Sequence, residues 1–283
     1  MENDILHVEG AFKGSAGARL FFQQWVPASA KASVVIIHGI GEHCARYNHV
    51  ARFLARRRYA VYTYDMRGHG RSAGQRGHVL SINDYLADID IFIRILSPLD
   101  RVFLLGHSLG GLLAIRSAMD CPDKFKGIIA SAPALGLSVK IPVVKKISAR
   151  ILSFIHPSFT MIDDTIQAAH LSHDPAIVLS YDKDPLITRR RSARFVTELL
   201  RTINTIRNEA GRLIAPCLFL QAELDRIISN EAMRVFYDRI SSPDKSLKIY
   251  RGFYHEIFNE IGKDQPLADT ADWLDNITAK YSF

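Results

Sequence analysis

The pentapeptide Gly106-His-Ser-Leu-Gly110 most constrains what this chain can fold into, because it stands between an apolar run over 101–105 and a helical pattern over 109–119. A strand that turns sharply into a helix holds the central serine in a strained backbone conformation with its hydroxyl exposed. Side chains two residues to either side would clash across that turn, so both positions need glycine. The context therefore predicts a nucleophilic serine, Ser108, at the carboxyl end of a buried strand.

Strands and helices alternate along most of the chain. Ile82, Leu86, Ile89, Ile93 and Leu96 recur at helical spacing and predict a helix over 82–96. Strands are predicted over 20–26, 33–37, 59–65, 101–105, 127–133, 216–221 and 247–250, and further helices over 109–119, 229–240 and 270–281. Strands that are apolar on both faces and alternate with helices form a mostly parallel sheet covered by helices on both faces. We therefore expect an α/β fold.

Residues 136–214 do not follow the strand–helix repeat. This segment is expected to be mostly helical, with breaks at Pro142, Pro157, Pro175 and Pro185. A chain of 283 residues fits one large domain or two small ones at about 150 residues per domain. We therefore expect a core formed by residues 1–135 and 215–283, with residues 136–214 inserted between two of its strands as a helical cap, or lid.

A serine hydroxyl needs a general base, and the base needs a carboxylate to orient it. In this architecture the order along the chain is serine, acid, histidine, each at the carboxyl end of a strand. Of the eleven histidines, His255 alone lies in the last third of the sequence. Asp225 follows the strand over 216–221 and is the expected acid, with Glu223 as its nearest competitor. A role for Asp225 as the cap of the next helix stays open.

The negative charge that develops on a substrate oxygen needs two hydrogen-bond donors. One is expected from the backbone N–H of Leu109, directly after the serine. The other is expected from Ile40, in the glycine-bearing loop His38-Gly-Ile-Gly41 that follows the strand over 33–37. We interpret His38 as a structural residue that holds this loop.

Several of these motifs together are similar to one known family. The sequence resembles the monoacylglycerol lipase/lysophospholipase branch of the α/β-hydrolases at His38-Gly-Ile-Gly-Glu-His43, Arg46-Tyr47, Asp65-Met-Arg-Gly-His-Gly-Arg-Ser72, Gly106-His-Ser-Leu-Gly-Gly111, Asp225-Arg226 and His255. The resemblance covers the core on both sides of the cap. The element His-Gly-x-Gly-Glu-His is its most specific part.

The resemblance implies an α/β-hydrolase fold in which Ser108, Asp225 and His255 form the catalytic triad, and in which Ile40 and Leu109 line the oxyanion hole. It also implies that Glu42 and Arg46 place a glycerol-like polar end, with Tyr181 reaching down from the cap. The expected activity is serine carboxylic-ester hydrolysis, which releases fatty acid from monoacylglycerols or similar single-chain lipid esters through an acyl-enzyme on Ser108.

Other activities use the same residues and remain open. A lysophospholipase or a small-ester carboxylesterase would need the same triad, and an acyltransferase results if an alcohol outcompetes water. A non-catalytic ligand receptor on a hydrolase scaffold is a more distant alternative. A dehalogenase is excluded, because its nucleophile position should hold aspartate where this chain has Ser108.

The net charge of +7 is concentrated in the predicted cap, since 12 of the 36 Lys and Arg residues but 7 of the 29 Asp and Glu residues lie in 136–214. Basic residues (Lys140, Lys145, Lys146 and Arg150) surround an apolar stripe at Val144, Ile147, Ile151 and Ile155. The stripe either packs the cap onto the core, the interpretation we favour, or contacts a membrane or micelle surface transiently. Without a basic run interleaved with aromatics, nucleic-acid binding is not expected.

The sequence predicts a cytoplasmic protein, with attachment to a membrane surface as an open alternative. Its apolar runs are far shorter than the roughly 20 residues that span a bilayer, and its first residues lack the apolar stretch of a signal peptide. Cys44, Cys121 and Cys217 are unclustered, which favours reduced thiols. His170 and His173 have no nearby ligand partners, so no metal is expected, and the chemistry requires no cofactor.

Overall fold

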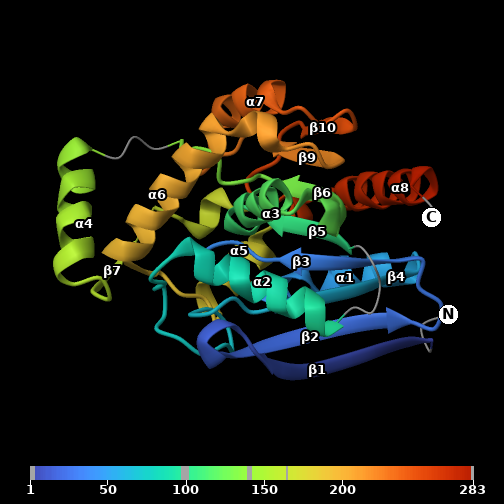
Figure 1. Cartoon of the computed structure of the whole chain (residues 1–283), viewed down its shortest axis with the longest axis horizontal. Helices are drawn as coiled ribbons and strands as arrows, with labels where there is room; N and C mark the ends of the chain where they lie inside the picture. Colours follow the sequence, from blue (N-terminus) through green and yellow to red (C-terminus); the bar gives the residue numbers. More distant parts are fainter. Residues whose placement is uncertain (1–3, 97–101, 139–141, 164, 282–283) are drawn as a thin grey trace.

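Eight strands form one mixed sheet at the centre of the protein in the computed structural model, which describes residues 4–96, 102–138, 142–163 and 165–281 (Figure 1). The spatial order of the strands is β1-β2-β4-β3-β5-β6-β9-β10. Their bounds are Ile5–Lys13 for β1, Arg19–Pro27 for β2, Ala32–Ile37 for β3, Tyr59–Tyr64 for β4, Val102–His107 for β5, Phe125–Ser131 for β6, Cys217–Ala222 for β9 and Lys245–Tyr250 for β10. In this spatial order, all neighbouring strands from β4 to β10, β3 included, pair in parallel. Strand β2 pairs antiparallel with both of its neighbours, β1 and β4.

The parallel strands are buried on both faces, as their continuous apolar sequences predict. Every residue of β3, β4, β5 and β9 is buried. Successive side chains of β3 enter opposite layers, because Val34 and Ile36 join one hydrophobic cluster and Val35 and Ile37 join the other. The sheet therefore separates two cores.

Helices cover both faces of the sheet, which confirms the predicted α/β architecture. The helices α1 (Asn48–Arg56) and α8 (Asp264–Lys280) fill the core on one face, and α2 (Ile82–Leu96), α3 (Leu109–Asp120) and α7 (Asn230–Arg239) fill the core on the other (Figure 1). The predicted helix over 82–96 has the same bounds as α2. The elements β1 and α1 were not predicted. β1 is a largely solvent-facing edge strand without a clear apolar pattern. In α1, the buried residues Val50, Ala51, Leu54 and Ala55 recur at helical spacing, so this helix had a signal that was overlooked.

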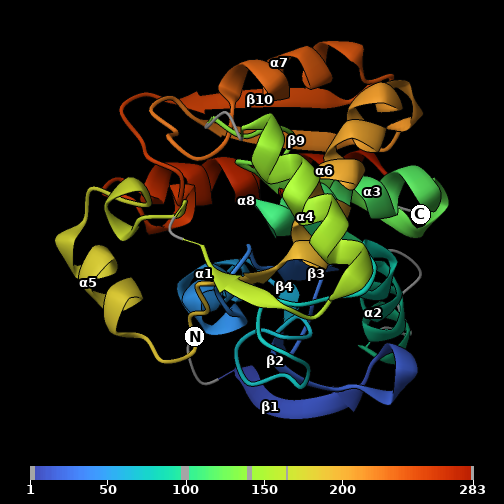
Figure 2. The same ribbon diagram turned by 90° about the vertical axis from the view of Figure 1, so that its left-hand side faces the viewer.

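Between β6 and β9, the residues that the structure describes add no strand to the large sheet. They form α4 (Val143–Ile155), β7 (Thr160–Ile162), α5 (Pro175–Lys183), β8 (Arg190–Ser192) and α6 (Ala193–Asn208). The antiparallel pair β7–β8 was not predicted, since three-residue strands leave no readable pattern. Helix α6 packs onto the core and α4 contacts α6 on its outer side; in Figure 2, α4 crosses in front of the end of the sheet. Arg101, the first residue of the predicted strand over 101–105, and Lys140, beside the apolar stripe of the predicted cap, lie outside the described residues.

Short 3-10 helices make several of the connections, and two of them flank the candidate site. They are Ser15–Gly17, Cys44–Tyr47, Pro122–Lys124, Ala168–His170, Ala210–Arg212 and Ile257–Asn259. Among the described residues, no helix is both long enough and apolar enough to cross a bilayer.

Candidate active site

Ser108 lies at the turn between β5 and α3 in a conformation that L-residues rarely adopt, with φ 51° and ψ −113°. A Cβ on Gly106 would lie 2.1 Å from the carbonyl oxygen of Gly110, and a Cβ on Gly110 would lie 2.1 Å from that of Ile37. Both glycines are therefore required by backbone atoms that cannot move aside. The amino terminus of α3 directly follows the serine, so its first amide, that of Leu109, is adjacent to the hydroxyl.

Asp225 and His255 come from the loops after β9 and β10 and form a hydrogen bond, with 2.7 Å between Asp225 Oδ2 and His255 Nδ1. The other carboxylate oxygen of Asp225 accepts the backbone N–H groups of Ile227 and Ile228 at 2.8 and 2.9 Å. These bonds hold the carboxylate in one orientation. Because a carboxylate accepts, Nδ1 of His255 donates, and Nε2 is left free to receive a proton.

The structure also decides between Asp225 as the acid and the two alternatives considered above, which were Glu223 as the acid and Asp225 as the cap of the next helix. The carboxylate of Glu223 accepts the backbone N–H of Gly252 at 2.9 Å and is solvent-exposed. Helix α7 is capped by Ser229, whose hydroxyl accepts from Ala232 N. Asp225 is thus the acid that the fold brings to His255.

The imidazole of His255 is buried, and burial lowers its pKa. The adjacent Asp225 carboxylate outweighs that effect through its charge and its hydrogen bond, and the carboxylates of Glu256 and Glu42 add to it. The net result is a pKa above the ordinary value of 6.5. A histidine in this setting accepts a proton readily and is stabilised as imidazolium.

Ser108 and His255 both face one narrow cavity of about 10 Å³. The wall consists of Gly39, Ile40, Glu42, His107, Ser108, Ile166, Leu171, Tyr181, His255 and Glu256. This space holds about one water molecule. Ser108 is 4% exposed, so the expectation of an accessible hydroxyl is wrong for this state: Ile166, Leu171 and Tyr181, all from the segment between β6 and β9, cover it.

Glu42 and Arg46 belong to a buried ionic cluster that reaches the wall of this cavity. Arg46 pairs with Glu42, with 3.1 Å between Nε and Oε2, and also with Glu256. The carboxylate of Glu42 further accepts the N–H of Gly39 at 2.5 Å and the hydroxyl of Tyr47 at 2.7 Å. The side chains of Glu42 and Arg46, which were expected to place a glycerol-like end, therefore already have hydrogen-bond and ion-pair partners within the protein. Glu42 also reaches the cavity wall.

Glu256 was missed by the sequence analysis, although it directly follows His255. Its side chain is 3% exposed, and burial raises its pKa while the Arg46 charge opposes that shift. An acid next to a candidate catalytic histidine was the available signal. Its partner Arg46 lies 210 residues earlier in the chain, beyond the reach of pattern analysis.

His38 is buried and holds the loop that contains Ile40. Its Nε2 accepts the N–H of Met66 at 3.0 Å, and Nδ1 donates to the carbonyl of Gly39 at 2.7 Å. Burial lowers the pKa of His38 to about 4, so the ring is neutral. This is the structural role that we predicted for His38.

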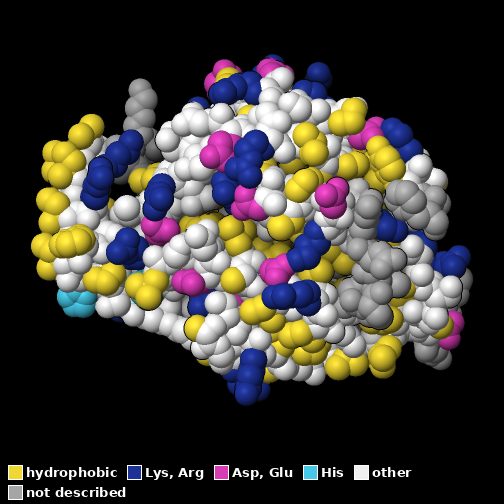
Figure 3. All heavy atoms as spheres, viewed as in Figure 1, with side chains coloured by type: hydrophobic (Ala, Val, Ile, Leu, Met, Phe, Trp, Pro, Cys, Tyr) yellow, Lys and Arg dark blue, Asp and Glu magenta, His cyan; other side chains and the backbone are white. Residues whose placement is uncertain are grey.

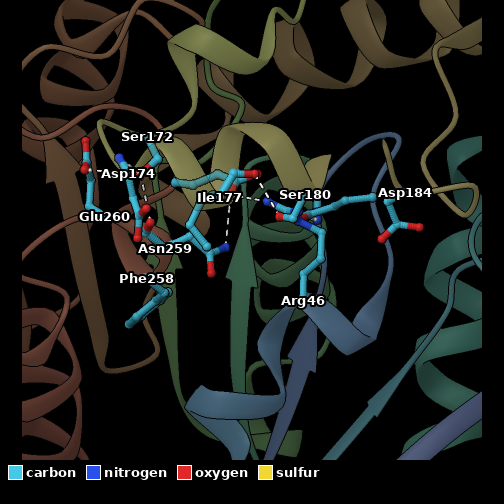
Figure 4. A network of polar contacts seen from close by, with 12 residues as sticks. Arg46, Ser172, Asp174, Ile177, Ser180, Asp184, Phe258, Asn259 and Glu260 are labelled. Atoms are coloured by element: carbon cyan, nitrogen blue, oxygen red, sulfur yellow. Dashed lines mark hydrogen bonds and ion pairs between the residues drawn. The ribbon is translucent and has the colours of Figure 1, made fainter. Parts of the chain in front are cut away.

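Tyr181 reaches the site from α5, as expected, and its ring lies 5.1 Å from the guanidinium carbon of Arg46. The N-terminal side of α5 is bound to the loop after His255, where Ser172 donates to the carbonyl of Asn259 at 2.9 Å (Figure 4). Its C-terminal side is bound to the Ile40 loop, where Thr188 N–H donates to the carbonyl of Gly41 at 2.8 Å. Both attachments fix α5 over the cavity.

Within the described ranges, no three metal-ligating side chains lie together.

Comparisons with known proteins identify the family of this chain. A family model described as serine aminopeptidase, S33, matches residues 28–262. A monoacylglycerol lipase from Mycolicibacterium smegmatis is 31% identical over 94% of this chain and 96% of its own, and a monoglyceride lipase from Rattus norvegicus is 32% identical over 87% and 82%.

The crystal structure of a monoacylglycerol lipase from Paleococcus ferrophilus superposes with a TM-score of 0.86 at 33% identity, covering 91% of this chain and 99% of that one. The chain has the α/β-hydrolase fold and belongs to the serine aminopeptidase S33 family.

Proposed function

We propose that this protein is a serine ester hydrolase that cleaves monoacylglycerols into fatty acid and glycerol. The observation that carries the proposal is the strained Ser108 facing the same cavity as the His255–Asp225 pair. Relatives that match this chain over most of their own length are named monoacylglycerol or monoglyceride lipases, which supports the choice of substrate.

In the proposed reaction, Ser108 Oγ attacks the ester carbonyl carbon while His255 Nε2 accepts the hydroxyl proton. Asp225 orients the imidazole and stabilises the imidazolium. The backbone N–H groups of Ile40 and Leu109 donate to the oxyanion, a contribution worth about 10²–10³ in rate for one donor. His255 then protonates the leaving glycerol oxygen, and a water molecule, activated by the same histidine, releases the fatty acid from Ser108.

We propose that residues 136–214 act as a cap that admits the acyl chain. The cavity of about 10 Å³ is far too small for a fatty acyl group, so the wall must open before an ester can bind. The wall that covers Ser108 includes Ile166 and Leu171 from this segment, whose apolar side chains suit an alkyl chain. Since α5 is bound to the core at both sides, and the carbonyl of Leu171 accepts the N–H of Glu256 at 2.9 Å, opening is expected at residues 165–170.

The apolar stripe of α4 does not pack onto the core, so the packing interpretation was wrong. The exposed fractions are 74% for Val144, 54% for Ile147, 55% for Ile151 and 73% for Ile155. Phe154 is 87% exposed as well. Figure 3 shows hydrophobic side chains along the outer rim at the left, where α4 lies in Figure 1, beside lysine and arginine side chains.

We propose that this face of α4 lies on an anionic lipid surface, from which the substrate enters. The measurement is co-sedimentation with phosphatidylglycerol and with phosphatidylcholine vesicles. Ile151→Ser/Phe154→Ser should bind phosphatidylglycerol vesicles much more weakly than wild type. Ile249→Ser, which changes an exposed residue of β10, is the matched control. Equal binding by the α4 variant and the control would exclude the α4 surface.

The substrate assignment is tested by comparing initial rates on mono-oleoylglycerol, on a short-chain ester and on an oleoyl lysophospholipid. The proposal predicts the highest kcat/KM on mono-oleoylglycerol. Activity on the short ester alone would make the protein a small-ester carboxylesterase, and transfer of oleate to glycerol at high glycerol concentration would make it an acyltransferase. Failure to react with a fluorophosphonate would favour a non-catalytic receptor.

A further inference from the structure

A second, larger cavity of about 670 Å³ lies beside the candidate active site. Most of its wall comes from residues 181–190, the chain that runs from the end of α5 to β8. Arg76, from the loop before α2, and Ile162, from β7, complete the wall. It is large enough for the polar headgroup of a lipid.

We call this second cavity the outer cavity. Its wall contains the arginines Arg76, Arg189 and Arg190 but only the carboxylates of Asp182 and Asp184, and both carboxylates have partners. Arg189 is paired with Asp182 at 2.5 Å. Asp184 accepts from His43 at 2.8 Å and from the backbone N–H of Leu186 at 2.8 Å. Both carboxylates on the wall are therefore engaged.

The other two arginines of this wall differ from Arg189. Within the described part of the chain, the side chains of Arg76 and Arg190 have no acidic partner, and both are solvent-exposed at the wall of the cavity. Arg191 lies buried behind the wall and donates to the carbonyl of Thr188 at 2.7 Å, while its nearest carboxylate, that of Asp163, is 4.0 Å away. The arrangement gives the cavity a positive potential with two guanidinium groups available for ligand contacts.

The two cavities share one residue, Tyr181, which lines both the outer cavity and the cavity of Ser108 and His255. Tyr181 is therefore the side chain at which the two cavities adjoin. An adjoining cavity suits a headgroup attached to the glycerol of a bound single-chain ester.

We infer that Arg76 and Arg190 form a binding site for a phosphate group in the outer cavity. Guanidinium groups match phosphate oxygens in charge and in geometry, because each presents parallel N–H donors. The phosphate comes either from the headgroup of a single-chain lipid ester whose acyl carbonyl lies at Ser108 or from free phosphate. The headgroup assignment rests on the proposed ester hydrolase function, whereas phosphate binding itself does not.

The first arm of the test is a calorimetric titration of the full chain with inorganic phosphate and with sn-glycerol 3-phosphate. Wild type should bind, and Arg76→Gln/Arg190→Gln should bind at least about tenfold more weakly, since two charge-assisted contacts are lost. Arg201→Gln, at a side chain 78% exposed on α6, is the matched control and should bind like wild type. Absent binding by wild type, or equal binding by the double variant, would overturn the site.

The second arm identifies the source of the phosphate. The ratio of kcat/KM for 1-oleoylglycerol 3-phosphate to kcat/KM for 1-oleoylglycerol is measured in all three proteins. A ratio that falls about tenfold in the double variant alone assigns the phosphate to the lipid headgroup. An unchanged ratio, with phosphate binding still lost in the first arm, assigns the site to free phosphate. Because the first arm needs no turnover, a chain without esterase activity would contradict the proposed function and leave the phosphate site standing.

Discussion

Asp225 and His255 are joined by a 2.7 Å hydrogen bond between side chains that are 1% and 4% exposed, although the two residues lie 30 positions apart on different loops. A carboxylate in this position fixes the tautomer of the imidazole. It also raises the histidine pKa against the effect of burial. In the proposed mechanism, the pair therefore sets the pH range in which Ser108 is activated.

Asp225→Asn should lower kcat by about 10⁴, because the amide favours the wrong tautomer of His255. Without the carboxylate, burial lowers the pKa of His255, so the acid limb of any residual kcat/KM profile should move to lower pH. Glu223→Gln is the matched control and should retain wild-type activity. A larger loss in Glu223→Gln than in Asp225→Asn would reassign the acid.

Glu256→Ala should destabilise the fold by about 3 kcal/mol, because it leaves the Arg46 guanidinium buried with one partner instead of two. Urea unfolding measures the change. Asp272→Asn breaks the exposed Arg57–Asp272 pair and should cost less than about 1 kcal/mol. Equal effects of the two substitutions would show that the buried cluster contributes no more than a surface pair.

Ser108→Gly should be more stable than Ser108→Ala by about 1 kcal/mol, although both variants lack the nucleophile. Glycine adopts φ 51° and ψ −113° without the strain that any Cβ imposes there. Thermal unfolding of the two variants side by side gives the difference. If the alanine variant is equally or more stable, the turn stores no strain at this residue.

Acid should destabilise the protein between pH 6.5 and about 4 through His38. Its pKa is lowered to about 4 in the folded state, whereas the unfolded chain has the ordinary value of 6.5. The unfolded state therefore binds more protons in this window, and the free energy of unfolding falls as the pH falls, by up to about 3 kcal/mol from this residue.

Urea unfolding at pH 7 and pH 4.5 measures this dependence. His38→Gln should show a smaller loss of stability between the two pH values than wild type. His156→Gln changes an exposed histidine and should show the wild-type loss. The assignment to His38 is contradicted if its variant keeps the full pH dependence.

The parallel strands of the sheet, and the positions of Ser108, His255 and Asp225 at the ends of those strands, could be predicted from the sequence because they depend on local signals. Ser108 is marked by its two glycines and by the change from strand to helix. His255 and Asp225 are marked by their order along the chain and by their place after buried strands. Each of these signals spans a few residues, and the parallel sheet brings them to the same edge.

Contacts between distant segments could not be predicted. Arg46 and Glu256 meet across 210 positions, and neither residue alone indicates that it is buried. The apolar stripe of α4 is a second example. The spacing of its residues predicts a hydrophobic helix face, but it does not predict whether that face packs against protein or remains exposed to solvent. Strands as short as β7 and β8 form only because they pair with each other, so the sequence of either one does not predict them.

The central claim, ester hydrolysis through Ser108, is tested most directly by trapping the acyl-enzyme. The protein is mixed with mono-oleoylglycerol, quenched in acid within milliseconds and digested, and the peptides are analysed by mass spectrometry together with the released oleate. The account predicts an oleoyl ester on Ser108 that disappears as oleate accumulates, and neither product from Ser108→Ala. Oleate release by Ser108→Ala at the wild-type rate, or an acyl group on another residue, would contradict it.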